Sequence, residues 1–143
     1  MTAKEYLKEI RRMKERSDSL RRRIEELWEM AASTGAIEYD KDRVQVSPVN
    51  TLEKSVLQIF HLNEKYLRSI ARYHAEIQKR DAEISELNRA DYEEILRLRY
   101  FEFLQFDEIA DRMGKSDDRV RNLHGEALQA FEAVMQKNKV STK

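Results

Sequence analysis

Two stretches of the chain repeat their apolar residues at alternating intervals of four and three, and this spacing constrains the fold more than any other feature. Such a repeat places one apolar stripe along a helix, as in a coiled coil. The first stripe consists of Tyr6, Ile10, Met13, Ser17, Leu20, Ile24, Leu27 and Ala31. The second consists of Leu52, Val56, Ile59, Asn63, Tyr66, Ile70, Tyr73, Ile77, Arg80, Ile84 and Leu87.

Capping signals give the expected starts of these two helices. Thr2 with Glu5, and Asn50 with Glu53, have the spacing of a capping box, in which two side chains satisfy free backbone amides at a helix N-terminus. The first helix is therefore expected to start at Thr2 and to end near the sequence "ASTG". The second is expected to run from Asn50 to about residue 88.

The segment between the helices, at about residues 33–50, breaks the helical period. It carries the only proline, Pro48, and a β-branched alternation at Val44 and Val46, which indicates a loop with an extended stretch. A loop of this length lets the helices fold back on each other. We expect an all-α fold in which residues 1–89 form a long antiparallel helical hairpin.

Apolar residues beside the stripes widen the surface that the hairpin must cover. A widened stripe is typical of a helix that faces more than one partner helix. The flanking residues are Leu7, Trp28, Leu57, Phe60, Leu62 and Leu67. We therefore expect a four-helix arrangement, made by a homodimer or with another protein. The residues expected to serve oligomerisation are Ile10, Met13, Leu20, Ile24, Leu27, Leu52, Val56, Ile59, Asn63, Tyr66, Ile70, Tyr73 and Ile77.

Three polar residues, Ser17, Asn63 and Arg80, interrupt the apolar stripes. Polar groups at core positions cost stability but fix the register of the helices, because any other alignment leaves them without partners. Alternatively, they lie at the ends of the hairpin or on its wet edge. The sequence leaves both interpretations open.

The composition excludes several classes of protein. The chain has 143 residues, about the size of one domain, and its 27 basic and 27 acidic residues cancel, so any attraction to DNA must be local. There is no cysteine, which excludes disulfides and thiolate metal sites. The N-terminus lacks an apolar signal segment, and no run approaches the roughly 18 apolar residues of a membrane helix. We expect a cytoplasmic protein without membrane contact.

Residues with catalytic chemistry do not gather in any recognisable motif. His61, His74 and His124 are scattered, and no second ligand stands at metal-site spacing. Three glycines cannot supply a phosphate-binding loop. The sequence therefore predicts no enzyme activity, no metal site and no cofactor.

The C-terminal part, residues 90–143, has a shorter helical pattern. Asp91 with Glu94 is predicted to open a third helix by the capping-box spacing, followed by a short helix at 106–113 and a longer helix from Asp117. Between the last two helices, "GKS" offers a glycine for a left-handed C-cap and a serine for an N-cap. The residues expected to form the core between the crossing helices are Ile109, Ala110, Met113, Val120 and Leu123.

The segment "LRLRYFEFLQFDEIADRMGKSDDRVRNLHGEALQAF" resembles region 4 of bacterial sigma factors. The matching positions are Arg99, Tyr100, Asp107, Glu108, Ile109, Ala110, Gly114, Ser116, Val120, Ala127 and Leu128. The whole arrangement, with its "DRVQ.SP" loop and the phrase "LHGEAL", is similar to a phage and prophage family of small sigma-like proteins. It is also similar to phage late-gene transcription regulators. The resemblance implies a helix-turn-helix that acts in transcriptional control.

In a helix-turn-helix, the start of the second helix enters the major groove of double-stranded DNA. The candidate contacts are Lys115, Ser116, Asp117, Asp118, Arg119, Arg121 and Asn122. The two arginines suit guanine edges or phosphates, the asparagine suits adenine, and the lysine suits a phosphate.

The two aspartates oppose this hypothesis, because an unpaired acid repels phosphate. Residues 91–143 hold nine basic and eleven acidic residues, a net charge of −2, which is not the basic excess of an autonomous DNA-binding domain. The expected function is transcription regulation through DNA binding by a homo-oligomer, since two linked modules add their binding through effective concentration. The alternatives are a protein-interaction module that contacts RNA polymerase, a sigma factor or another partner, and a phage DNA-packaging recognition subunit.

Overall fold

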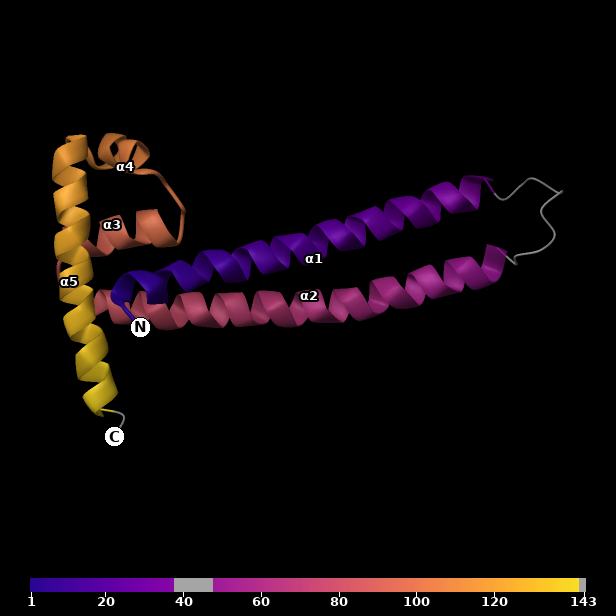
Figure 1. The fold of residues 1–143 in the computed structure, drawn as a ribbon, viewed down its shortest axis with the longest axis horizontal. Coiled ribbons are helices and arrows are strands. Elements are labelled where there is room, and N and C mark those ends of the chain that lie inside the picture. Colours follow the sequence, from indigo (N-terminus) through magenta and orange to yellow (C-terminus); the bar gives the residue numbers. More distant parts are fainter. Residues whose placement is uncertain (38–47, 142–143) are drawn as a thin grey trace. The chain divides into compact units, whose positions relative to one another are not determined.

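The computed structural model of the protein describes residues 1–37 and 48–141, with the backbone alone for 34–37 and 48–51. Within these ranges every regular secondary-structure element is a helix, which confirms the all-α prediction (Figure 1). The helices are α1 (Ala3–Ile37), α2 (Pro48–Ser85), α3 (Ala90–Tyr100), α4 (Phe106–Met113) and α5 (Asp117–Ser141). The predicted extended stretch at Val44 and Val46 lies outside the described residues.

The chain divides into two compact units. Unit 1 consists of Met1–Met13 and Tyr73–Lys143, and unit 2 consists of Lys14–Arg72. The first turns of α1 and the last turns of α2 therefore belong to the same compact unit as α3, α4 and α5. The functional division at residue 89 stays a prediction.

Unit 2 consists of the antiparallel segments of α1 and α2. The hydroxyls of Ser17 and Ser69 lie 2.6 Å apart and share a hydrogen bond across the pair. Leu27 and Ile59, both on the predicted stripes, are buried between the helices. This arrangement confirms that the four-three repeat forms the seam of an antiparallel hairpin.

At the base of the hairpin, in unit 1, Arg80 is almost completely buried, with an exposed fraction of 1%. Its Nη2 donates to Glu9 at 2.7 Å, its Nη1 forms a hydrogen bond and ion pair with Glu76, and its Nε donates to the carbonyl oxygen of Tyr6 at 3.0 Å. The guanidinium also lies 4.0 Å from the centre of the Tyr6 ring. Each of the three guanidinium nitrogen atoms of this buried cation therefore donates a hydrogen bond to a partner.

The three polar residues of the stripes have different roles. Ser17 and Arg80 are buried and hydrogen-bonded across the hairpin, so they favour this register over any other. Asn63 is exposed, as the alternative interpretation predicted. The register of each unit thus depends on one buried polar contact as well as on apolar packing.

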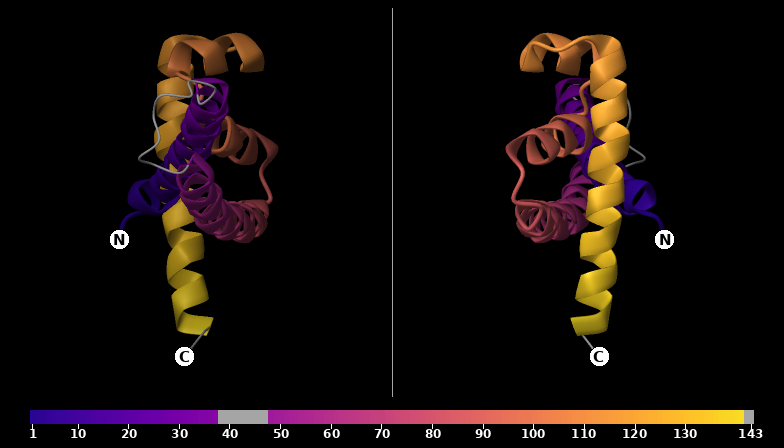
Figure 2. Two further views of the ribbon diagram at one scale, coloured as in Figure 1. Left: turned by 90° about the vertical axis from the view of Figure 1, so that its right-hand side faces the viewer. Right: turned by 90° about the vertical axis from the view of Figure 1, so that its left-hand side faces the viewer.

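The core of unit 1 is assembled around α5. Buried side chains of α5, with Phe131 among them, contact α3 and α4, and Ala3 and Leu7 of α1 complete the cluster. The side views in Figure 2 show α3 and α4 both lying beside α5. The backbone amide of Ala3 donates to the carboxylate of Glu132 at 2.8 Å, which joins the start of α1 to α5.

The predicted helix starts are partly correct. Thr2 and Glu5 form both hydrogen bonds of a capping box, as predicted. The second prediction is wrong, because α2 begins at Pro48 and Asn50 lies inside the helix. Proline suits this first turn, since its missing amide would have no partner there and its backbone angle is already helical.

The third predicted capping box, at Asp91 and Glu94, is also wrong. The N-cap of α3 is Arg89, whose backbone amide donates to the Glu93 carboxylate at 3.0 Å. Asp91 lies in the first turn and pairs with the Arg89 guanidinium at 3.0 Å. In a chain so rich in charge, acids stand at capping-box spacing by chance.

The residues predicted for oligomerisation differ in exposure. Ile10, Leu27 and Ile59 are covered within the single chain. Leu52 and Val56 remain 45% exposed. Any surface left for a second copy is therefore formed by exposed residues of unit 2 rather than by the covered part of the seam.

We predict that Arg80→Ala lowers the free energy of unfolding by about 3 kcal/mol, because removing one partner of a buried ion pair leaves the other charges uncompensated. Urea unfolding followed by far-UV circular dichroism measures this loss. Arg72→Ala, an exposed arginine of the same helix, should change stability by less than about 0.5 kcal/mol. Equal effects of the two substitutions would contradict the proposed role of Arg80.

Candidate nucleic-acid interface

The turn between α4 and α5 is defined by local capping. Gln105 and Glu108 form a capping box at the start of α4, and Gly114 ends this helix in the left-handed conformation with φ of 66°. The Ser116 hydroxyl accepts a hydrogen bond from the amide of Arg119 at 3.2 Å. The predicted roles of the glycine and the serine are confirmed.

Apolar contacts fix the two helices against each other. Ile109 and Ala110 of α4 are buried with Val120 and Leu123 of α5, as predicted, and Met113 packs against this cluster while partly exposed. The small side chain at position 110 lets the helices approach closely. The first two turns of α5 are thus anchored on one side and open to solvent on the other.

All residues predicted to contact DNA are exposed at the turn and the start of α5. They are Lys115, Ser116, Asp117, Asp118, Arg119, Arg121 and Asn122. The structure therefore brings the predicted residues together on one surface, and their contact with DNA stays a prediction.

The two arginines of this surface have different neighbours. Arg119 lies 3.7 Å from the carboxylate of Glu126, an exposed pair in which each side chain is about half accessible. Arg121 extends over the ring of Phe106, with its guanidinium carbon 5.4 Å from the ring centre. Neither contact buries its cation, so both guanidinium groups stay available to a ligand.

Arg99 is a further cation of this surface that was absent from the predicted contact set. Its guanidinium carbon lies 4.3 Å from the centre of the Phe106 ring, and its Nη1 donates to the carbonyl oxygen of Leu104 at 2.9 Å. Arg99 and Arg121 therefore meet at one aromatic ring, although α3 carries one and α5 the other. Only the Arg-Tyr pair of the resemblance marked this position in the sequence.

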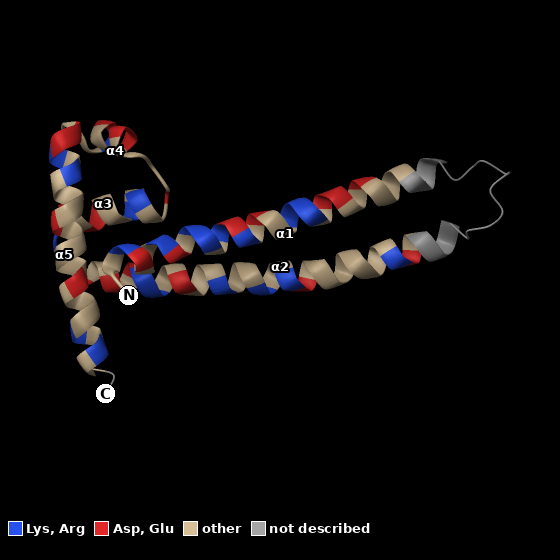
Figure 3. Ribbon diagram, viewed as in Figure 1, with Lys and Arg blue, Asp and Glu red and all other residues tan. Residues whose placement is uncertain are grey.

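Acidic residues occupy the first turns of both helices of the motif. Figure 3 shows this acidic colouring at the starts of α4 and α5, which corresponds to Asp107, Glu108, Asp117 and Asp118. A carboxylate in a first turn is stabilised by the positive end of the helix dipole, by about 0.3–1 kcal/mol. These acids therefore have a structural role that is independent of any ligand.

His124 lies in the core of the motif, and nothing in the sequence had indicated this burial. Its Nε2 is 2.8 Å from the Tyr100 hydroxyl, and its ring meets Phe106 edge-on at 5.1 Å. Burial, assisted by the positive charges of Arg99 and Lys4, lowers the pKa of His124 to about 4. Burial likewise raises the pKa of Tyr100 to about 12. Both groups are therefore neutral at neutral pH.

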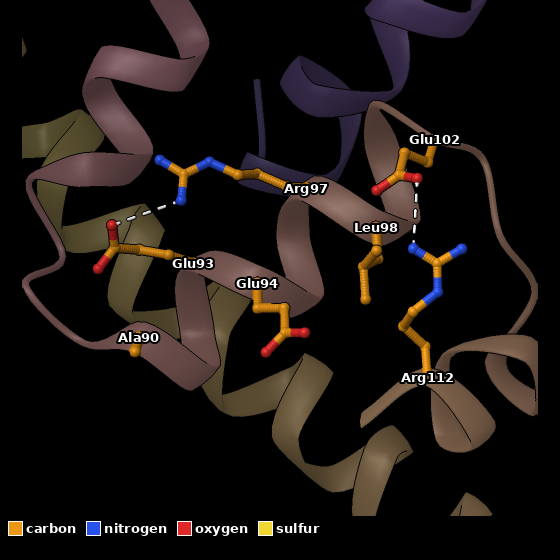
Figure 4. A pocket seen from close by; sticks show the side chains of 7 residues that line it. All are labelled: Ala90, Glu93, Glu94, Arg97, Leu98, Glu102 and Arg112. Carbon is orange, nitrogen blue, oxygen red and sulfur yellow. Dashed lines mark ion pairs between the residues drawn. The ribbon is translucent and has the colours of Figure 1, made fainter. Parts of the chain in front are cut away.

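A hollow of about 470 Å³ lies beside α3 and α4, and its lining is largely charged (Figure 4). Arg97 lies 3.6 Å from Glu93, and Arg112 lies 3.6 Å from Glu102. Arg97 also forms a 2.7 Å ion pair with Asp81. Because each arginine of the lining already meets a carboxylate, the hollow is poorly suited to an anionic ligand.

The described ranges, 1–37 and 48–141, contain neither a candidate membrane span nor a cluster of candidate metal ligands. No helix there is both long and apolar enough to cross a membrane. Nor do three or more histidine or carboxylate side chains gather there as the ligands of a metal ion would.

A family model described as sigma-70, region 4, matches residues 90–131. The match covers α3, α4 and α5 as far as Phe131, and it includes every residue predicted to contact DNA. This part of the chain therefore has a sigma-70 region 4-like helix-turn-helix. No curated protein and no solved structure matches the chain.

We predict that His124 makes stability depend on pH. The pKa of His124 is about 4 in the folded chain and has its ordinary value of 6.5 in the unfolded chain. As the pH falls, the unfolded chain therefore binds a proton at this histidine before the folded chain does. The contribution of His124 to the free energy of unfolding is fully present above about pH 6.5. It falls by up to about 3 kcal/mol as the pH drops to about 4. Urea unfolding across this range measures the effect.

The variant His124→Gln should flatten that pH dependence, because the amide does not titrate. His74→Gln, at an exposed histidine, should retain the wild-type profile. A profile for His124→Gln that is as steep as the wild-type profile would show that other groups cause the loss.

Proposed function

We propose that the protein is a DNA-binding transcription regulator whose α5 enters the major groove of double-stranded DNA. The observation that carries the proposal is the exposed start of α5, with Lys115, Arg119 and Arg121, within a segment that matches sigma-70 region 4. The apolar side of α5 is anchored on α3 and α4, so the exposed side is presented on a rigid support.

Each cationic or neutral polar residue of the interface has an expected role in DNA binding. Arg119 and Arg121 contact guanine edges or phosphates, Asn122 pairs with adenine, and Lys115 contacts a phosphate. Arg99 joins this set as a phosphate contact, because it shares the Phe106 ring with Arg121. Ser116 holds the N-terminus of α5 in place.

The regulator acts as a homo-oligomer in this proposal. The C-terminal part has no basic excess, so a single copy has little general attraction to the phosphate backbone. Two linked copies turn the second contact into an intramolecular event with a high effective concentration. The exposed apolar residues of unit 2 supply the surface for this association.

The proposal also includes a phage or prophage origin, which rests on the resemblance to phage sigma-like proteins, and a cytoplasmic location, as expected from the sequence. The second candidate is a protein-interaction module, because Asp117 and Asp118 suit a partner with a basic surface, such as RNA polymerase or a sigma factor. A packaging subunit is the third candidate with the same architecture. DNA binding separates the second candidate from the other two.

We predict that Arg119→Ala combined with Arg121→Ala weakens binding to double-stranded DNA by at least about tenfold, since each lost base or phosphate contact costs about 1–3 kcal/mol. The affinity is measured at several salt concentrations on fragments of the source genome. The slope of log affinity against log salt should become shallower by about two when two phosphate contacts are lost.

The control removes two other cations from the same helix, with Lys137→Ala and Lys139→Ala, which lie beyond the segment that matches the family model. Affinity and slope should then stay close to the wild-type values. Absence of DNA binding by the wild-type chain, even at low salt, would refute DNA recognition and favour the protein partner. Equal losses from both double variants would refute the assigned contacts.

We predict that Asp117→Asn combined with Asp118→Asn strengthens DNA binding, because two charges that repel phosphate are removed. The same change should lower the free energy of unfolding by about 0.3–1 kcal/mol for each aspartate, since neutral residues interact less with the helix dipole. Affinity and urea unfolding are measured on the same samples. Weaker DNA binding at unchanged stability would show instead that the aspartates accept hydrogen bonds from cytosine.

A further inference from the structure

Unit 2 exposes four large apolar side chains at matching positions. Trp28, Leu57, Phe60 and Leu67 have exposed fractions of 54%, 58%, 57% and 57%. Each directly follows a residue of the seam. We call the surface formed by these four side chains the apolar face of unit 2.

The four residues lie on the same side of the helix pair. Successive residues of a helix are rotated by about 100°, so a residue directly after the seam points to the side of the pair. When two antiparallel helices are viewed from one end, this rotation runs in opposite senses, and both sets of residues point to the same side. Trp28 of α1 thus shares a face with Leu57 and Phe60 of α2.

The α2 part of this face lies in a stretch without charge. Residues 55–63 of α2 contain no Lys, Arg, Asp or Glu in a chain that is 38% charged, and Figure 3 shows this stretch in tan. A monomer rarely exposes contiguous apolar patches larger than a few hundred Å². The face therefore has the composition of a covered surface.

We propose that the apolar face of unit 2 is covered by the same face of a second copy, with the two-fold axis parallel to the helices. In this arrangement α1 of each copy packs antiparallel on α2 of the other, which gives a four-helix bundle. The inference rests on the proposed function, because it names the surface through which two helix-turn-helix modules are joined.

The register of the hairpin determines which residues meet. Ser17 is level with Ser69, so Trp28 is level with the stretch between Leu57 and Phe60. A two-fold axis along the helices keeps levels unchanged. Trp28 of each copy therefore packs on Leu57 and Phe60 of the other, and this contact is made twice.

Arg21 and Glu64, which flank the apolar face, have opposite charges and lie at nearly the same level in this register. Arg21 also follows a seam residue directly and is level with residue 65, next to Glu64. Its own partners are distant, with Asp18 at 3.8 Å and Glu25 at 4.0 Å. Across the residues that the structure describes, Glu64 has no ion pair. The two-fold arrangement places Arg21 of each copy opposite Glu64 of the other.

The side of the helix pair that carries the apolar face is close in size to a standard dimer interface. From residue 14 to residue 32 this side extends about 28 Å along the helices and about 20 Å across the pair, which is roughly 560 Å² in projection. The corrugated surface of the side chains has a larger accessible area. It therefore approaches the roughly 800 Å² that each partner contributes to a standard interface.

A charge-reversal cycle on the full chain tests the proposal. Arg21→Glu or Glu64→Arg alone should weaken the dimer at least about tenfold, because each puts like charges opposite each other twice. The two substitutions in one chain should restore most of the wild-type affinity. Sedimentation equilibrium at several protein concentrations, without DNA, gives the dissociation constants.

A second variant tests the apolar contact. Leu57→Glu combined with Phe60→Glu should give a monomer at concentrations where the wild type is a dimer. Val140→Glu, at a still more exposed apolar residue that lies in α5, should leave the dimer unchanged. Circular dichroism checks that helicity is retained, as expected for exposed positions. A monomeric wild type, or a dimer that the Leu57→Glu and Phe60→Glu variant leaves intact, would overturn the proposal.

The absence of cysteine allows a direct test of the orientation. Single-cysteine chains carrying Arg21→Cys and Glu64→Cys are mixed and oxidised. Crosslinked dimer should form in the mixture and not with either chain alone. Crosslinking of Arg21→Cys chains to each other, without the mixed product, would refute the two-fold axis parallel to the helices. Neither outcome depends on DNA binding, so failure here is distinguishable from failure of the proposed function.

Discussion

The guanidinium group of Arg80 lies between α1 and α2 and meets two carboxylates, a backbone carbonyl and the Tyr6 ring. A shift of one helix along the other would separate this buried cation from Glu9 and Tyr6 of α1, so the pairing at the base of the hairpin is selected as well as stabilised. That pairing places Ala3 and Leu7 in the same core as α3, α4 and α5. The start of α1 is therefore part of the support of the helix-turn-helix.

The acidic residues of the candidate DNA surface have opposite effects on helix stability and on DNA binding. Asp117 and Asp118 stabilise the start of α5 but oppose phosphate, whereas Arg119 and Arg121 remain accessible. A single module with this balance attracts DNA weakly. In the proposed dimer, association through the apolar face of unit 2 would supply a second module, and the resulting gain would not require any further basic residue.

Features set by local chemistry were predictable from the sequence. The four-three repeats predicted the hairpin. Gly114 and Ser116 predicted the turn, because a left-handed cap and a hydroxyl cap depend on neighbouring residues alone. Capping boxes failed at Asn50 and Asp91, where spacing without burial carries little information. The burial of His124 and the convergence of Arg99 with Arg121 on Phe106 depend on how α3 meets α5. No local pattern encodes such contacts.

The central claim is that this helix-turn-helix binds DNA usefully only when two copies are joined by the hairpin. The most direct measurement compares DNA affinity of the wild-type chain with that of the Leu57→Glu and Phe60→Glu chain, whose helix-turn-helix is unchanged. We expect two wild-type chains for each DNA site and an affinity at least about a hundredfold higher than that of the monomeric variant. Equal affinities, with one chain bound for each site, would contradict the account.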